Sequence, residues 1–330
     1  MSRVCFVVPF RDAARWLPEA VASLRAQTSP DWTAVFVDDG SEDDGPALAA
    51  VDPRITVIPS PGRGLVAALD AGMAAARASG AAYIARFDAD DVCRPDRVAR
   101  QVAFLDAEPH VDVLDSRWDP LTAGPAPGGL LRYRAWHDSI TTHEDVVREL
   151  LVESPVCHPA VMMRAASLPP GPLYRDVDGP EDYDLWLRLV RAGLRFHKLP
   201  ERLIGWRDHD DRTTRTDDRY RKEAFFAAKW AHFEATDPST RMVVWGARRG
   251  GKRWIRALAH AGRLAGVVDI DPRVIGGDRF GAPVVAPEGL AGLDADRVLI
   301  AVGAAGARAA IEARLRGMGI VGLAVAGSAG

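Results

Sequence analysis

Three aspartates within four residues, Asp88, Asp90 and Asp91, form a dense group of chemically active side chains. They directly follow an apolar run, Tyr83 to Phe87, whose composition is typical of a buried strand. Carboxylates this close repel one another where water is scarce, and a divalent cation relieves the repulsion. Because hard oxygen ligands suit Mg²⁺ and Mn²⁺, the pattern indicates a metal site, with a solvated turn that caps the helix after Pro95 as the structural alternative.

Further polar groups follow other predicted strands. Asp38-Asp39-Gly40-Ser41 comes after the run Thr33 to Val37, and Pro9 to Asp12 comes after Val4 to Val8. At a strand end, such carboxylates can accept hydrogen bonds from a nucleotide base or ribose, although Asp38-Asp39-Gly40-Ser41 alone is also an ordinary turn. In an open parallel sheet the strand ends converge on one crevice, so we expect these groups to share a site.

The elements that position these groups alternate between strand and helix. Helical spacing predicts helices after the first, third and fourth strands, which favours a parallel, doubly wound sheet. Glu181-Asp182 begins another predicted helix, and the Gly- and Pro-rich stretch within residues 110–140 predicts a long loop. The predicted strands and helices are marked by Val4–Val8, Leu17–Leu24, Thr33–Val37, Ile55–Ile58, Leu65–Met73, Tyr83–Phe87, Val98–Leu105, Glu144–Val152, Tyr183–Val190 and Leu203–Trp206.

Six short segments, in the order in which they occur along the chain, resemble glycosyltransferase family 2. The matching segments are Val7–Phe10, Val37–Ser41, Gly64-Leu65, Tyr83–Asp91, His158–Arg164 and Glu181–Arg188, where the last two count as the later segments of that family. The resemblance covers roughly residues 3 to 210 and implies a GT-A fold with a mixed, doubly wound sheet. It also implies an enzyme that uses a nucleoside-diphosphate sugar, most simply a UDP-sugar, with Mn²⁺ or Mg²⁺ as cofactor.

The resemblance also assigns roles to residues of this chain. Asp90 would bind the metal, joined by His209, and Asp182 would be the general base that deprotonates the acceptor hydroxyl. His158, Glu181 and Arg207 would contact the acceptor or the diphosphate. The residues expected to bind the nucleotide sugar, with Pro9 and Asp39 at the base and Asp88 at the ribose, are Pro9, Phe10, Arg11, Asp12, Asp38, Asp39, Arg63, Gly64, Asp88, Ala89 and Asp90.

Two departures and two structural alternatives qualify these roles. Asp12 and Asp70 each stand where the family commonly has asparagine, so the exact sugar contacts remain open. Asp182 also suits a helix N-terminus, where Pro and acidic residues are favoured. A lone histidine such as His158 or His209 is more commonly a structural imidazole than a ligand.

A second α/β pattern begins after the predicted linker 237–240. The segment Gly246 to Gly251 follows a predicted strand at dinucleotide-binding spacing, but Arg248 replaces the middle glycine, which argues against ordinary NAD binding. Asp269 lies where a ribose-binding acid would sit. We therefore predict a Rossmann-like accessory domain over residues 241–330, with a structural or interaction role favoured over nucleotide binding, after a GT-A domain over 1–236 that divides into a nucleotide-sugar half, 1–108, and an acceptor half, 109–236.

Composition sets the broad class. With 330 residues, 48% apolar side chains and a net charge of -3, the chain is typical of a globular protein of about two domains, and nothing indicates nucleic acid as a partner. Residues 241–330 have 13 basic and 7 acidic side chains, a net +6 against -9 for residues 1–240. This favours packing of the two parts, with peripheral contact to an anionic membrane surface as the alternative.

Three scattered cysteines and no long apolar run predict reduced thiols and no transmembrane segment, hence a cytoplasmic protein that could work at the inner membrane face. We therefore predict an inverting, metal-dependent glycosyltransferase that modifies a glycan or glycoconjugate hydroxyl, in surface polysaccharide or glycoconjugate assembly. Two alternatives remain: a sugar-nucleotide-binding protein without turnover, and a nicotinamide-dependent oxidoreductase in the C-terminal domain.

Overall fold

The computed structural model describes residues 2–248, 250–304 and 306–325. The chain divides into two compact units. The first comprises the residues up to Val146 together with Val156–Ala224, and the second comprises Val147–Pro155 with the chain from Phe225 onward. The predicted bounds 1–236 and 241–330 concern domains that fold independently, and they stay a prediction.

An eight-stranded mixed sheet forms the first unit, in the order β3-β2-β1-β4-β7-β6-β8-β5. The first four strands along the chain are parallel, and β7 runs antiparallel to both β4 and β6. The strands are β1 (Val4–Phe10), β2 (Trp32–Asp38), β3 (Ile55–Pro59), β4 (Tyr83–Arg86), β5 (Val92–Cys93), β6 (Val113–Leu121), β7 (Met162–Arg164) and β8 (Phe196–Arg207). The predicted mixed, doubly wound GT-A-type sheet is therefore confirmed.

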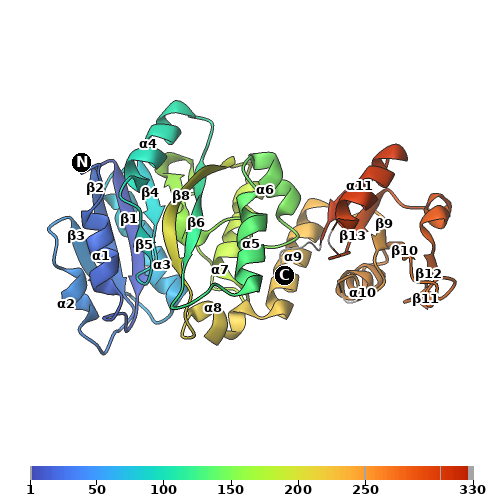
Figure 1. The fold of residues 1–330 in the computed structure, drawn as a ribbon, viewed down its shortest axis with the longest axis horizontal. Helices are drawn as coiled ribbons and strands as arrows, with labels where there is room; N and C mark the ends of the chain where they lie inside the picture. Colours follow the sequence, from blue (N-terminus) through green and yellow to red (C-terminus); the bar gives the residue numbers. More distant parts are fainter. Residues whose placement is uncertain (1, 249, 305, 326–330) are drawn as a thin grey trace. The chain divides into compact units, whose positions relative to one another are not determined.

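Helices follow the strands as the apolar spacing predicts. Helix α3 packs on β1 and β2, and α1 packs near β5 (Figure 1). The helices and 3₁₀ turns of this part of the chain are α1 (Leu17–Arg25), α2 (Gly45–Ala49), α3 (Leu65–Ala78), α4 (Arg97–Ala107), α5 (Gly128–Asp138), α6 (His143–Glu149), η1 (His158–Ala160), η2 (Ala165–Ser167), α7 (Glu181–Arg191), α8 (Thr213–Thr216) and η3 (Asp218–Tyr220). Each parallel strand of this half therefore ends in a loop at the same edge of the sheet.

The expectation of a long loop over residues 110–140 is wrong. Strand β6 occupies Val113–Leu121 and helix α5 occupies Gly128–Asp138, so the Gly- and Pro-rich connection is only the short segment between them. The strand is held by long-range pairing with β7 and β8, and α5 packs along β6 (Figure 1). Pairing between distant segments leaves no local periodic signal, which is why the pattern missed both elements.

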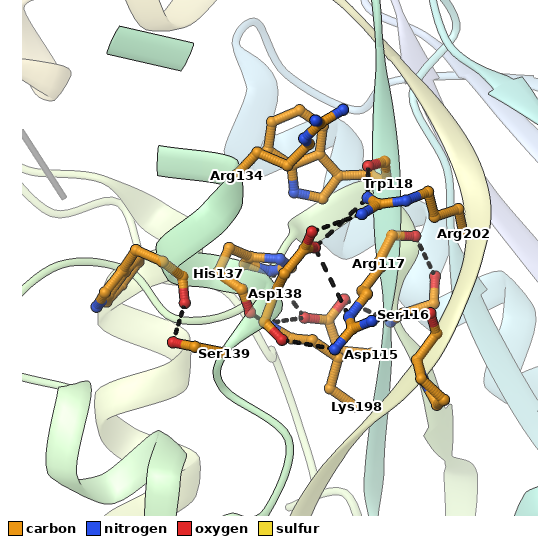
Figure 2. Close-up of polar contacts among 12 residues, drawn as sticks. Asp115, Ser116, Arg117, Trp118, Arg134, His137, Asp138, Ser139, Lys198 and Arg202 are labelled. Atoms are coloured by element: carbon orange, nitrogen blue, oxygen red, sulfur yellow. Dashed lines mark hydrogen bonds and ion pairs between the residues drawn. The ribbon is translucent and has the colours of Figure 1, made fainter. Parts of the chain in front are cut away.

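A buried polar network joins helix α5 to strands β6 and β8, as Figure 2 shows. The Asp115 Oδ2 atom lies 3.1 Å from His137 Nε2 and 3.3 Å from Lys198 Nζ, and it accepts from the Cys157 N–H at 3.2 Å. Burial, reinforced by the charge of Lys198, lowers the pKa of His137 to about 4, so this imidazole is neutral. Although burial opposes ionisation, the charge of Lys198 holds the pKa of Asp115 below its ordinary value. One buried ion pair thus fixes the chain just before η1.

The second unit contains a six-stranded sheet in the order β11-β12-β10-β9-β13-β14. All neighbouring pairs are parallel except β11 with β12, and the parallel strands follow the dinucleotide-fold order 3-2-1-4-5. Its elements are α9 (Lys222–Thr236), β9 (Met242–Trp245), α10 (Lys252–His260), β10 (Leu264–Val268), β11 (Asp278–Arg279), β12 (Ala282–Val285), η4 (Pro287–Gly292), β13 (Arg297–Ile300), α11 (Ala307–Gly317) and β14 (Val321–Ala324). A second sheet domain is thus present, as predicted.

A segment from the middle of the chain, Val147–Pro155, belongs to this second unit. Leu151 packs in the same core cluster as Phe233, and Lys229 Nζ donates to the Val152 carbonyl at 2.8 Å. The buried Glu149 forms an ion pair of 2.8 Å with Arg308 at the start of α11. The unit is therefore discontinuous in sequence, which the predicted boundary did not anticipate.

Candidate active site

The candidate site lies at the carboxyl ends of β1, β2 and β4. The sheet order reverses between β1 and β4, since β2 and β3 lie on one side of β1 and β4 on the other. In doubly wound sheets this reversal opens a crevice in which ligands bind. The loops after β1, β2 and β4 carry the residues singled out from the sequence, so the topology brings these three groups to one edge.

The acidic cluster after β4 is built as a cation site would be. One ligand oxygen from each of Asp88, Asp90 and Asp91 lies within 4.8 Å of the others. Asp91 is 1% exposed, and its Oδ2 atom has no hydrogen-bond partner among the described residues. Burial and the neighbouring carboxylates raise the pKa of both Asp90 and Asp91. A hard divalent cation fits this set, because it would satisfy the orphaned oxygen and offset the repulsion.

Residues from the end of β8 and just beyond it close over the acidic cluster. The Arg207 N–H donates to Asp91 Oδ1 at 2.8 Å, and Arg207 Nε donates to the Asp90 carbonyl at 2.6 Å. His209 Nε2 lies 2.8 Å from Asp90 Oδ2, and the imidazole packs against Trp16 at 5.2 Å between ring centroids. The structure therefore brings together Asp90 and His209, the two residues predicted as metal ligands from distant parts of the chain.

Hydrogen bonds connect the loop after β2 to the loops after β1 and β3. Asp39 accepts from the Gly64 N–H through both carboxylate oxygens, at 2.8 and 2.9 Å. Gly64 has φ 102°, a conformation that side chains rarely adopt, and it is the N-cap residue of α3. Asp38 accepts from the Ser41 N–H, and Asp12 joins the same loop, since its N–H donates to the Ser41 hydroxyl and its carboxylate accepts from the Glu42 N–H. These loops form one connected rim beside β1.

The remaining predicted nucleotide-binding residues divide by burial. Pro9 and Phe10 lie in β1, and Phe10 packs edge-on against Phe36 with ring centroids 6.2 Å apart. Ala89 is buried within the acidic loop. Arg11 and Arg63 are exposed, with Arg11 3.5 Å from the Asp12 carboxylate. Phe10 and Ala89 thus shape the core beneath the rim, whereas the two arginines stand at its surface.

Glu181 and Asp182 begin helix α7 in the other half of this unit. Glu181 is buried and accepts from the Tyr220 hydroxyl at 2.8 and 3.0 Å, with Arg219 Nη1 at 3.9 Å. Burial and the adjacent Glu181 raise the pKa of Asp182 to about 8. Asp182 Oδ1 accepts from the Tyr183 N–H at 2.7 Å, which orients the carboxyl at the helix start. A carboxyl that titrates near neutrality is suited to accept a proton.

His158 is a buried, neutral imidazole on the same side. Its Nε2 atom lies 2.6 Å from the Tyr174 hydroxyl, and burial together with the charge of Arg86 lowers its pKa well below the ordinary value. The backbone around Tyr174 is in turn fixed by Asp70, whose Oδ1 accepts from the N–H groups of Leu173 and Tyr174. The unusual aspartate at position 70 therefore has a structural partner in this chain.

Three residues of the site were not singled out from the sequence. Arg86 pairs with Asp88 at 2.5 Å and influences the protonation of Glu181, Asp182 and His158. Tyr220 and Arg219 reach Glu181 from the polar segment after β8. The density of charged residues over 207–221 is the sequence signal for that segment. Arg86 lies within the matching segment Tyr83–Asp91, but the resemblance assigned it no role.

In the second unit, the glycine-rich segment after β9 is closed by internal contacts. Both carboxylate oxygens of Asp269 accept backbone N–H groups, from Ala247 at 2.7 Å and from Asp271 at 2.9 Å. Arg248 forms an ion pair with Asp271. A Cβ atom at Gly251 would collide with the Gly246 carbonyl, so the loop and the start of α10 approach closely. Asp269, the predicted ribose-binding acid, is thus hydrogen-bonded to the backbone of these loops.

Comparison with known proteins agrees with this geometry. Residues 5–168 match the model of Glycosyl transferase family 2. EpsE of Bacillus subtilis (strain 168) is 28% identical over 218 residues, which is 63% of this chain and 74% of EpsE. The succinoglycan biosynthesis protein ExoO of Rhizobium meliloti (strain 1021) is 40% identical over 107 residues, 32% of this chain and 30% of ExoO.

A solved structure shares the fold at low sequence identity. The structure of S. aureus TarS residues 1-349 in complex with UDP-GlcNAc matches with a TM-score of 0.55 and 16% identity, over 78% of this chain and 80% of that one. The sheet has a GT-A-type fold, and the family match with the similar glycosyltransferases identifies the protein as a glycosyltransferase. The chain belongs to glycosyltransferase family 2, through its first unit.

No helix in the described part of the chain combines the length and the apolar character needed to cross a membrane. The three cysteines are buried, and none of them bonds to another.

Proposed function

We propose that the protein transfers a sugar, with inversion, from a nucleoside-diphosphate sugar to a hydroxyl of a glycan or glycoconjugate. The observation that carries the proposal is the acidic cluster at the strand-order reversal, with the buried, orphaned Asp91 Oδ2, in the same unit as the Glu181–Asp182 pair. TarS, a structural neighbour, is in complex with UDP-GlcNAc, which favours a UDP-sugar as the first donor class to test. The relative ExoO is named as a succinoglycan biosynthesis protein, which supports polysaccharide assembly as the first pathway to test.

The donor would lie along the rim formed by the loops after β1, β2 and β4. Asp39 has lone pairs left to accept from the base, because its two oxygens share the single Gly64 N–H. Asp88, whose side chain is 30% exposed, would accept from a ribose hydroxyl. Mn²⁺ or Mg²⁺ held by Asp90 and His209 beside Asp91 would stabilise the charge of the departing diphosphate.

On the acceptor side, Asp182 would take the proton of the attacking hydroxyl. Its raised pKa makes it a stronger base than an exposed aspartate, and Tyr183 N–H holds one of its oxygens in place. Neutral His158 and buried Glu181 would shape the acceptor pocket. Orientation of both substrates by fixed side chains would supply much of the acceleration.

The test is nucleotide binding followed by turnover. Thermal shift with UDP, GDP and dTDP, each with and without Mn²⁺, identifies the nucleotide, because a ligand that binds the folded state raises its melting temperature. Hydrolysis and transfer are then measured with the matching nucleotide sugars. Asp90→Asn should abolish turnover and reduce the Mn²⁺-dependent part of the nucleotide shift, whereas Asp96→Asn, an exposed residue paired with Arg100, should leave both unchanged.

Two outcomes contradict the proposal. Nucleotide-sugar binding without hydrolysis or transfer would support the non-catalytic alternative. Metal-stimulated turnover that survives in Asp90→Asn would remove Asp90 from the metal site.

We further propose that the second unit has a structural role. Both oxygens of Asp269 already accept backbone N–H groups and Arg248 pairs with Asp271, which favours a role in holding this loop over binding of a ribose or a phosphate. A cofactor fluorescence titration with NADH tests this, and micromolar binding would favour the oxidoreductase alternative.

A further inference from the structure

Arg86 is a buried cation at the end of β4, the strand that leads into the acidic cluster. Its side chain is 4% exposed, and Nη2 lies 2.5 Å from Asp88 Oδ1. A second guanidinium nitrogen donates to the Phe87 carbonyl, and the Nε atom is buried with no acceptor among the described residues. The Arg86 backbone is also pinned, since its N–H donates to the Val161 carbonyl and its carbonyl accepts from Arg97.

The charge of the Arg86 guanidinium also acts on groups on the acceptor side. Burial disfavours its charge, but Asp88, Tyr174 and Glu181 together raise the pKa of Arg86, so it is permanently cationic. Its charge acts on Asp182 and on His158 as well, lowering the pKa of each. Arg86 therefore pairs directly with the carboxylate that would meet the ribose, and its charge also acts on the carboxylate that would take the proton.

We propose that Arg86 is a positioning residue that orients Asp88 toward the donor and supplies the buried positive charge shared by Asp88 and the Glu181–Asp182 pair. The proposal rests on the function proposed above and deepens it. In this arrangement one side chain couples the donor half of the site to the acceptor half. Its rigidity comes from β4, a central strand paired with both β1 and β7.

The expected consequence is a change in the acid limb of the pH profile. The described groups that interact electrostatically with Asp182 are Glu181 on its own helix, Arg86 from β4, Tyr174 from the loop before α7 and Tyr220 from η3. Glu181 already raises the pKa of Asp182, and Arg86 opposes that effect. Removing the cation should therefore move the titration of Asp182 upward from about 8, so that a smaller fraction of the base is ionised at neutral pH.

The experiment compares Arg86→Met, Arg86→Lys and the control Arg164→Lys, which alters an arginine of neighbouring β7 that contacts backbone carbonyls. For each variant we measure UDP affinity, the pH profile of kcat/KM between pH 6 and 10, and the melting temperature. Arg86→Met should shift the acid limb up by about one pH unit and weaken UDP about tenfold. Arg86→Lys should shift the limb less, because it keeps the charge, and Arg164→Lys should not shift it.

The readouts separate this proposal from the function on which it rests. A wild-type protein without turnover overturns the function, and the coupling with it. An active wild type whose acid limb is unchanged in both Arg86 variants overturns only the role of Arg86 and reduces it to a packing group. If Arg86→Met does not fold, Arg86→Lys provides the test. The proposal then requires that this variant bind UDP more weakly than the wild type at an unchanged melting temperature.

Discussion

Two loops of this protein each follow a strand that pairs in parallel with the first strand of its sheet, and their aspartates have opposite surroundings. After β4 in the first unit, Asp90 and Asp91 lie beside Asp88, and one oxygen of Asp91 is buried without a donor among the described residues. After β10 in the second unit, both oxygens of Asp269 accept backbone N–H groups. Both sheets follow the doubly wound order around their first strand.

The difference distinguishes the proposed cation site from a loop that is held by its own hydrogen bonds. Buried polar atoms are nearly always paired in folded proteins, so an orphaned carboxylate oxygen beside two other carboxylates favours a cation as its partner. A carboxylate such as Asp269, with a backbone donor on each oxygen, instead stabilises the loop that it joins. Strand-end position alone therefore does not identify a functional acid, whereas its hydrogen-bond partners do.

The largest effect should come from Asp182→Asn. Loss of the general base is expected to reduce turnover about a hundredfold or more, with little change in donor affinity. The melting temperature should not fall, because asparagine relieves the repulsion between Asp182 and Glu181 and its side-chain oxygen can still accept from Tyr183 N–H.

Asp184→Asn serves as the control on the same helix, since Asp184 pairs with Arg188 at 2.7 Å. Its turnover should match the wild type. An Asp182→Asn protein that turns over normally but unfolds more readily would show that Asp182 only stabilises the helix start.

The pH dependence should follow the same carboxyl. Because burial and Glu181 raise the pKa of Asp182 to about 8, the base is ionised above that pH and protonated below it. We expect kcat/KM to increase about tenfold per pH unit up to about pH 8 and then to level off, as measured in a rate profile from pH 6 to 10. A flat profile across this range would exclude Asp182 as the titrating base.

The smallest effect, on stability alone, sharpens the comparison of the two loops. Asp269→Asn should lower the free energy of unfolding by about 1–3 kcal/mol, because an amide nitrogen then faces a backbone donor. Asp90→Asn should leave it unchanged or raise it in metal-free buffer, because one repelling charge is removed. Chemical denaturation of both variants measures the contrast, and equal losses would mean that the acidic cluster is as structural as Asp269.

Local patterns in the sequence were sufficient for much of the first sheet and for the location of the site. The apolar runs predicted β1, β2, β3 and β4, and the acids that follow them do gather at one edge, because parallel strands bring their carboxyl ends together. The beginning of α7 at Glu181 and the second α/β region were also predicted. These features depend on periodicity and turn chemistry within a few residues, which a sequence displays directly.

What only the tertiary structure decided depends on contacts between distant residues. Strand β6 exists because it pairs with β7 and β8, and the segment Val147–Pro155 joins the second unit through partners such as Arg308. Tyr220 reaches Glu181 across 39 positions of the chain. The role proposed for Arg86 depends on β4, which holds its side chain against Asp88 while its charge acts on Asp182. Such electrostatic partners are set by the packing of the sheet and not by spacing along the chain, so sequence patterns could locate the acids of this site but not the cation that acts on them.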